Sequence, residues 1–109
     1  MKFSEYQKQS RETVVYPDAG NNYVYPTLGL AGEGGEIANK VKKIARDNAG
    51  TLSDEVREAL KGELGDVLWY AAQLATELDL SLEDIAEENI VRLQSRKARG
   101  TLHGDGDTR

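Results

Sequence analysis

Two pairs of acidic residues are the feature of this sequence with the clearest chemical potential. The first pair is Glu33 and Glu36, in the stretch EGGE, and the second is Glu63 and Asp66, in the stretch ELGD. Residues three apart lie on one face of a helix, so each pair can point two carboxylates at the same place. Two such pairs on antiparallel neighbouring helices would bring four carboxylates together, and a cation would have to neutralise them. An all-oxygen, anionic site of this kind favours Mg²⁺ or Mn²⁺.

Spacing alone does not distinguish a metal site from a charged surface. Two further acidic pairs have the same spacing: Glu55 with Glu58, and Asp84 with Glu87. At about 100° per residue, Glu33 and Glu63 fall at the margins of the apolar stripes of their helices, whereas the two further pairs face away from such a stripe. A carboxylate at a buried margin is costly without a cationic partner, so the first two pairs remain the candidates for a metal site.

Four amphipathic helices are predicted to position these residues. They span about residues 3–14, 27–48, 53–78 and 81–98, and the proline-containing stretch 16–26 is predicted to be a loop. Ser53 and Ser81 are predicted N-caps, because each precedes an acidic first turn. The Gly-rich tail, residues 100–109, is predicted to be flexible. The sequence therefore predicts a single all-α, four-helix-bundle-like domain over residues 1–109.

Glycines accompany both acidic pairs, although a glycine inside a helix costs about 0.5–1 kcal/mol relative to alanine. We expect Gly29 and Gly32 to let a neighbouring helix or the N-terminal segment approach closely. The glycines that flank the carboxylates are expected to leave room for a hydrated metal and a ligand: Gly34, Gly35, Gly62 and Gly65.

The composition excludes several other kinds of site. A net charge of −5 over 109 residues argues against a non-specific nucleic-acid binder, which needs a basic face. The absence of cysteine excludes thiolate metal sites and disulfides. The N-terminus is too polar for a signal peptide, and no apolar run is long enough to span a membrane, so we expect a cytoplasmic protein without a membrane partner.

The predicted fourth helix has a polar face beside its apolar stripe. Asn89, Arg92, Arg96 and Arg99 share this face. Such a face is either solvated and paired with acidic helices, or it is a phosphate clamp, because arginine forks match phosphate oxygens. Next to a carboxylate metal site, the phosphate clamp is the more economical interpretation.

These motifs together resemble the MazG-like nucleotide pyrophosphohydrolases, a family of all-α enzymes. The family signature is E-x-x-E on one helix and E-x-x-D on the next, and here EGGE and ELGD are separated by 26 residues. The surrounding stretches GLAGEGGEIAN, GELGDVLWYAAQLA and ENIVRLQSRKARG are also similar to the family's three blocks, and GTLHGDGDTR is similar to tails of a phage and actinobacterial type. The resemblance covers roughly residues 27–109. One departure is Arg92, where family members often carry lysine.

The resemblance implies hydrolysis of a (d)NTP at the α–β bond to a nucleoside monophosphate and pyrophosphate. The implied metal ligands for Mg²⁺ or Mn²⁺ are Glu33, Glu36, Glu63 and Asp66, and the general base is either Glu36 or Glu63. The implied substrate-binding residues are Asn89, Arg92, Arg96 and Lys97, which would hold phosphates and ribose. Tyr70, one turn after Asp66, is the best placed of the aromatic residues to contact the base. A homodimer or homotetramer and a role in nucleotide-pool sanitation are implied as well.

Two other functional classes compete with this hydrolase. A di-iron carboxylate bundle needs Glu-x-x-His motifs, and the single histidine, His103, lies in the tail. A non-catalytic helical module for oligomerisation or regulation, with merely solvated acidic pairs, stays open as the alternative.

Overall fold

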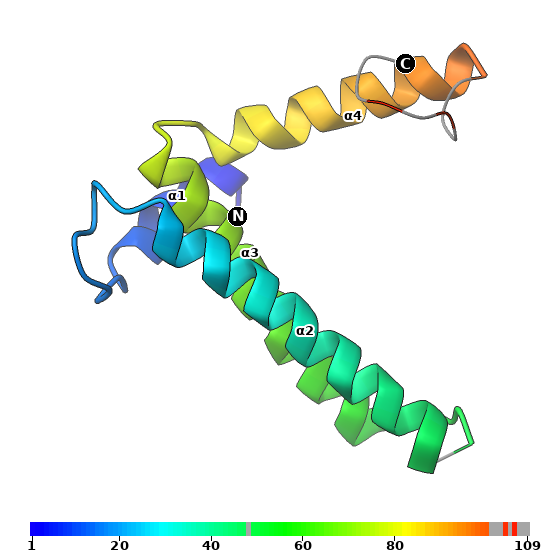
Figure 1. Cartoon of the computed structure of the whole chain (residues 1–109). Coiled ribbons are helices and arrows are strands. Elements are labelled where there is room, and N and C mark those ends of the chain that lie inside the picture. The colour runs from blue at the N-terminus through cyan, green and yellow to red at the C-terminus, as the bar shows by residue number, and fades with distance from the viewer. Residues whose placement is uncertain (48, 101–103, 105, 107–109) are drawn as a thin grey trace.

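The computed structural model describes residues 1–47, 49–100, 104 and 106, and the regular structure of these residues is entirely helical (Figure 1). The helices are α1 (Phe3–Arg11), α2 (Val24–Asp47), α3 (Asp54–Glu77) and α4 (Leu82–Ala98). This confirms the predicted all-α class. The predicted flexible tail and His103 lie almost wholly outside the described residues.

The helix ends follow local capping chemistry. Ser53 and Ser81 are N-caps as predicted, because their hydroxyls accept hydrogen bonds from the N–H groups of Val56 and Asp84, each at 3.2 Å. The predicted start of the second helix at residue 27 was wrong by three residues. Helix α2 begins at Val24, since the Asn22 side chain accepts the Tyr25 N–H at 3.1 Å. Pro26 then lies in the first turn, where its missing N–H leaves no helical hydrogen bond unmade.

The first helix ends three residues before the predicted boundary of 14. Thr13 accounts for this end, because both its N–H and its hydroxyl donate to the Ser10 carbonyl, at 3.0 and 2.7 Å. A threonine that satisfies the last carbonyls in this way closes a turn and does not extend the helix.

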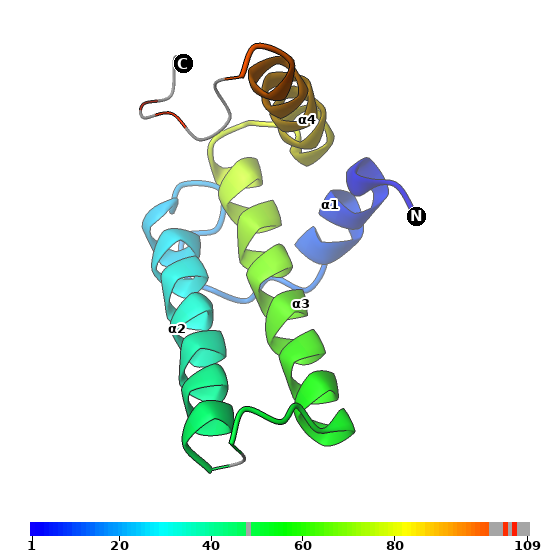
Figure 2. The same ribbon diagram turned by 90° about the vertical axis from the view of Figure 1, so that its right-hand side faces the viewer.

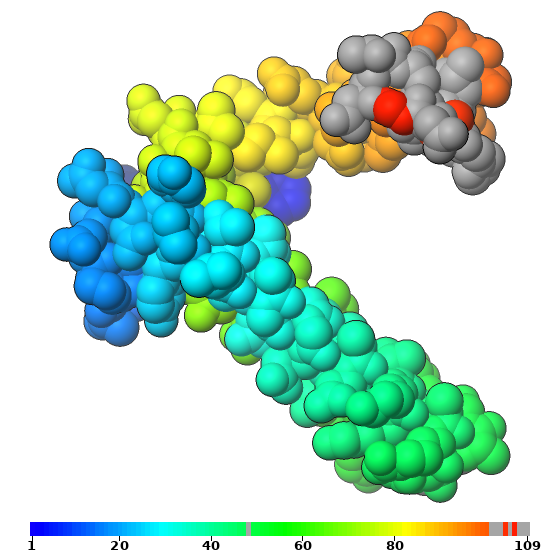
Figure 3. All heavy atoms as spheres, in the orientation of Figure 1, coloured from blue at the N-terminus to red at the C-terminus, as the bar shows by residue number. Residues whose placement is uncertain are grey.

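Helices α2 and α3 run side by side as a long antiparallel hairpin, which we call the arm (Figures 1 and 2). Helix α1 packs on the C-terminal half of α3. Helix α4 contacts α1 and α3 but, among the described residues, makes no contact with α2. Figure 3 shows α4 projecting away from the arm, so that one chain has the outline of an open V.

The direction of α4 is fixed by Gln7 of α1. Its amide nitrogen donates to the Leu80 carbonyl at 2.9 Å and to the Thr76 hydroxyl at 3.0 Å. Its amide oxygen accepts the Leu82 N–H at 2.8 Å. One side chain therefore holds both sides of the turn between α3 and α4.

Most of the buried residues lie at the end of the molecule where α1 crosses α3: Ser10, Tyr16, Pro26, Ala72, Gln73, Ala75 and Leu82. Arg96 is also buried, but it lies in the last turn of α4. Gln73 is fully buried but satisfied, since its amide nitrogen donates to the Ser10 hydroxyl at 2.9 Å and its oxygen accepts from Arg11 at 3.3 Å. This end of the molecule holds a polar, hydrogen-bonded core in addition to the apolar one.

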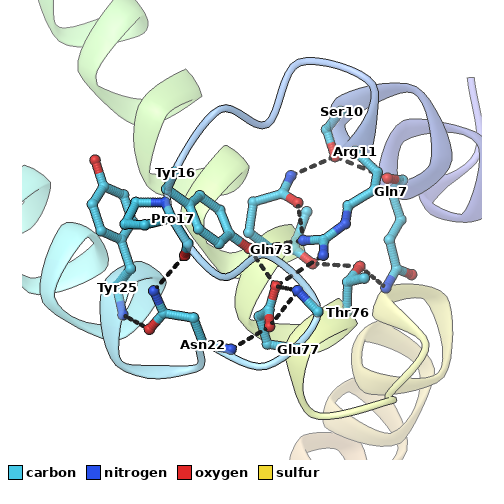
Figure 4. A network of polar contacts seen from close by, with 12 residues as sticks. Gln7, Ser10, Arg11, Tyr16, Pro17, Asn22, Tyr25, Gln73, Thr76 and Glu77 are labelled. Carbon is cyan, nitrogen blue, oxygen red and sulfur yellow. Dashed lines mark hydrogen bonds and ion pairs between the residues drawn. The ribbon is translucent and has the colours of Figure 1, made fainter.

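Glu77 attaches the loop before α2 to this core (Figure 4). Its carboxylate accepts from the Tyr16 hydroxyl at 2.6 Å, from Arg11 at 2.9 Å and from the N–H groups of Gly20 and Asn22 at 3.0 and 2.8 Å. Burial alone raises the pKa of Glu77, but these hydrogen bonds outweigh burial and lower the pKa to about 2. An ionised carboxylate thus determines where the loop lies.

Candidate active site

Three carboxylates meet between α2 and α3. One oxygen of each of Glu33, Glu63 and Asp66 lies within 4.8 Å of the others. Glu33 and Glu63 are half-buried, and Asp66 is exposed. We call these residues the carboxylate triad. Contact with Glu63 raises the pKa of Glu33 above its ordinary value, and burial and the charges of Asp66, Glu63 and Glu36 act in the same direction.

The donor set of the carboxylate triad fits a hard divalent cation. All three ligands are oxygens, and their like charges repel at this separation. Among the residues that the structure describes, Lys40 is the lysine paired with the triad, with its Nζ 3.8 Å from the Glu63 Oε1. One lysine cannot balance three carboxylates, so a cation such as Mg²⁺ or Mn²⁺ is chemically suited to this position.

Glu36, the fourth expected ligand, does not converge with the carboxylate triad. It is exposed on α2, one turn after Glu33, and its carboxylate is not within the 4.8 Å group. The same three-residue step on α3 brings both Glu63 and Asp66 into the group, so spacing alone does not account for the outward position of Glu36. Its charge still reaches the triad, because it contributes to the raised pKa of Glu33.

Gly29, one turn before Glu33 on α2, lets the aromatic ring of Tyr70 pack against the helix. A Cβ at position 29 would lie 2.2 Å from the Tyr70 ring, so only glycine lets this ring rest on the α2 backbone. The expectation of a close approach is confirmed at Gly29 and wrong at Gly32. A Cβ at any of the other arm glycines would have no described neighbour within 4 Å: Gly32, Gly34, Gly35, Gly62 and Gly65. The glycines next to the carboxylates thus border open space.

An aromatic cluster borders the triad on the side of the core. It consists of Tyr16, Tyr25, Trp69 and Tyr70. Tyr16 and Tyr25 stack with ring centroids 4.8 Å apart, and Trp69 and Tyr70 meet edge to face at 5.1 Å. Burial raises the pKa of Tyr70, and Tyr25 and the charges of Glu33 and Asp66 add to this effect. Tyr70 therefore lies within electrostatic reach of the carboxylates.

The predicted phosphate-binding residues lie on α4, away from the triad of the same chain. Asn89 and Arg92 line a groove between α1, α3 and α4, together with Phe3 and Leu68. Arg96 is buried farther along α4, and Lys97 is exposed beside it. Since α4 makes no contact with α2 among the described residues, the structure of one chain does not bring these side chains to the carboxylates.

Two residues near the site were missed by reasoning from the sequence. Lys40 is seven residues after Glu33, and this two-turn spacing on the same face of α2 would have been the signal. Glu77 carried no such signal, because its partners lie at least 55 residues away along the chain. No described helix is long and apolar enough to cross a lipid bilayer.

The sequence of this chain matches the model of a known protein family and a curated phage protein. The model of the MazG nucleotide pyrophosphohydrolase domain matches residues 26–100, which include α3, α4 and nearly all of α2. The chain is 50% identical to Gene 37 protein of Mycobacterium phage L5, in an alignment covering 95% of this chain and 96% of that protein. No solved structure matches the chain.

Proposed function

The chain belongs to the MazG nucleotide pyrophosphohydrolase family, and on this premise we propose that it hydrolyses a nucleoside triphosphate to a monophosphate and pyrophosphate. The observation that supports this proposal best is the carboxylate triad, because three oxygen ligands between two helices suit the Mg²⁺ of a phosphate-transferring site. Mn²⁺ has the same preference for oxygen ligands and is proposed as a substitute.

Glu33, Glu63 and Asp66 would hold the cation. When bound, such an ion polarises phosphate oxygens and lowers the pKa of a coordinated water. Between the two candidate bases, Glu36 is better placed than Glu63. It lies beside the triad without converging on it, whereas Glu63 belongs to the triad and faces Lys40 at 3.8 Å. In the proposed reaction, a carboxylate oxygen of Glu36 accepts the proton from the attacking water.

Tyr70 would contact the base. Its ring rests on Gly29 and lies within electrostatic reach of Glu33 and Asp66, so a nucleotide whose phosphates meet the cation has its base near this ring. Stacking on an aromatic face tolerates every nucleobase, and therefore this contact by itself does not select one.

A second copy of the chain would supply the phosphate-binding helix. Asn89, Arg92, Arg96 and Lys97 are on α4, which stands apart from the arm of its own chain (Figure 3). Large apolar residues are exposed on both elements: Ile90 and Val91 on α4, Val41 and Leu64 on the arm. We propose a homodimer, or a homotetramer built from dimers, in which α4 of one chain covers the triad of the other. The activity would remove unwanted nucleotides from the cytoplasmic pool.

A panel of (d)NTPs with Mg²⁺ or Mn²⁺ tests the proposal. We expect release of pyrophosphate, and not of orthophosphate, from at least one nucleotide. Asp66→Asn and Glu36→Gln should each abolish this release, while Glu87→Gln, an exposed position on α4, should retain it. Absence of turnover on every nucleotide, together with no metal-dependent shift of the unfolding temperature, would favour a non-catalytic oligomerisation or regulatory module.

A further inference from the structure

A basic pocket lies next to the carboxylate triad, on the side away from the aromatic cluster. Lys40 and Lys43 line it from α2, and Val56 and Ala59 line it from α3. Asp47 is the one acidic residue among the described residues that line this pocket. Arg46 engages both oxygens of Asp47, at 2.6 and 2.9 Å. The two lysines therefore dominate the charge of the pocket.

Lys40 contacts the carboxylate triad and also lines the basic pocket. Its Nζ is 3.8 Å from the Glu63 Oε1, and its side chain also lines the basic pocket. This separation is long for a charge-assisted hydrogen bond, which is typically about 2.7–2.9 Å. The Lys40 side chain is 36% exposed, so it is free to change partners at small cost in packing. The ion pair with Glu63 is thus a loose one.

A divalent cation in the triad would weaken this pair further. The ion would draw the Glu63 oxygens toward itself and repel the ammonium group of Lys40 by like charge. The basic pocket is then the nearest alternative for Lys40. An anionic group placed there would find two lysines and one acid whose charge is already offset by Arg46.

The order of the aromatic cluster, the carboxylate triad and the two lysines along the arm indicates which anion would bind in the basic pocket. Tyr70 packs on Gly29, one turn before Glu33, whereas Lys40 lies two turns after Glu33, roughly 10 Å along α2. Lys43 lies almost one turn farther. A nucleotide aligned with the arm has its base at the aromatic cluster and its α-phosphate at the triad. Its terminal phosphates then reach the two lysines.

We propose that Lys40 leaves Glu63 when the cation binds and holds the β- and γ-phosphates, with Lys43 at the outer edge of the pocket. This proposal rests on the proposed function. In the reaction, the water oxygen bonds to the α-phosphorus, and Glu36 takes a water proton. The bond from the α-phosphorus to the bridging oxygen breaks, and pyrophosphate leaves with that electron pair. Lys40 offsets the negative charge that pyrophosphate gains, and Lys40 is thereby a residue of the leaving-group site.

Binding of inorganic pyrophosphate to the Mn²⁺-loaded protein, measured by calorimetry, tests this role without any turnover. Lys40→Met should weaken pyrophosphate binding about tenfold, as expected for one charge-assisted contact in a partly exposed place. Lys40→Arg should restore most of the affinity. Lys42→Met is the matched control, because Lys42 is exposed on the same helix and does not line the pocket, and it should bind as the wild type does.

Mn²⁺ binding without pyrophosphate is the second measurement. Lys40→Met should bind Mn²⁺ at least as tightly as the wild type, since it removes a competing charge from Glu63. Unchanged pyrophosphate affinity in Lys40→Met would overturn the proposal, and a parallel loss of Mn²⁺ affinity would show that Lys40 only supports the triad. Pyrophosphate binding that depends on Lys40 in a protein without turnover would refute the proposed hydrolysis and leave the anion site standing.

Discussion

Replacing Glu77 with glutamine tests how the loop before α2 is held. The Glu77 side chain is completely buried, and its charge is the acceptor for Tyr16, Arg11 and two backbone N–H groups. Glutamine has nearly the same shape and can still accept one or two of these hydrogen bonds. It removes the charge, however, and turns an NH₂ group toward the remaining donors. The substitution thus isolates the electrostatic part of the network.

The magnitude follows from the pKa of Glu77, which falls from an ordinary value of 4.5 to about 2. Each pKa unit corresponds to about 1.4 kcal/mol, so the ionised form is favoured by at most roughly 3 kcal/mol in the folded state. Arg11 is 27% exposed, and solvent screens part of this interaction. We expect Glu77→Gln to lower the free energy of unfolding by about 2 kcal/mol at pH 7. For a chain of this size that corresponds to a fall of about 8 °C in Tm.

The effect must depend on pH in one direction. Because the folded-state pKa is lowered, the stabilisation is fully present above pH 4.5 and is lost as the pH falls toward 2. The difference between wild type and Glu77→Gln should therefore shrink between pH 4.5 and pH 2. Urea unfolding followed by circular dichroism at pH 7, 5 and 3 measures this, with Glu87→Gln as an exposed control. A loss at pH 7 no larger than that of the control, or one that is the same at pH 3, would refute the reasoning.

Two further predictions concern the site itself. In Gly29→Ala the new Cβ would lie 2.2 Å from the Tyr70 ring and displace it. The near-ultraviolet circular dichroism of the Trp69–Tyr70 pair should therefore change, and turnover should fall. Gly35→Ala, whose new Cβ meets no described atom within 4 Å, should keep the wild-type spectrum and turnover and should unfold at the same or a higher temperature. In Glu33→Gln, removal of a carboxyl whose pKa is raised should stabilise the metal-free protein at pH 7, and this gain should vanish as the pH falls to 4.5 or when Mn²⁺ saturates the wild type. Thermal unfolding across pH and metal concentration measures the second effect, and a destabilised Glu33→Gln protein without metal would contradict it.

The helices and their N-caps could be predicted because the determinants are local. Ser53 and Ser81 each bond a backbone N–H three residues later, and an amphipathic pattern specifies the helix that follows. The direction of α4 could not be predicted in this way. It depends on Gln7, whose hydrogen bonds to Leu80 and Leu82 join residues 73 and 75 positions apart. No local pattern reports such contacts.

In the candidate site, too, the features set by local spacing could be predicted and those set by long-range contacts could not. Glu33, Glu63 and Asp66 follow from helical spacing and from their place at the apolar margin, and in the structure their carboxylates converge. Glu36 has the same spacing, but its carboxylate lies outside the group, whereas the same three-residue step on α3 keeps both Glu63 and Asp66 inside it. Spacing on a helix therefore does not by itself decide which carboxylates converge. Where α4 lies relative to the carboxylate triad depends on long-range contacts such as those of Gln7, and the spacing of residues along the sequence carries no information about them.

The distribution of burial along the arm has a consequence for local stability. Every buried residue of the described chain lies before Thr27 or after Ala71, so the stretch that holds the carboxylate triad contributes none. Segments with little buried surface open at a small fraction of the free energy of global unfolding, while the region around Gln73 opens only when the whole fold is lost. The molecule therefore has a more stable end, around Gln73 and Tyr70, and a less stable stretch that holds the carboxylate triad. A ligand that rearranges the less stable stretch leaves the more stable end intact.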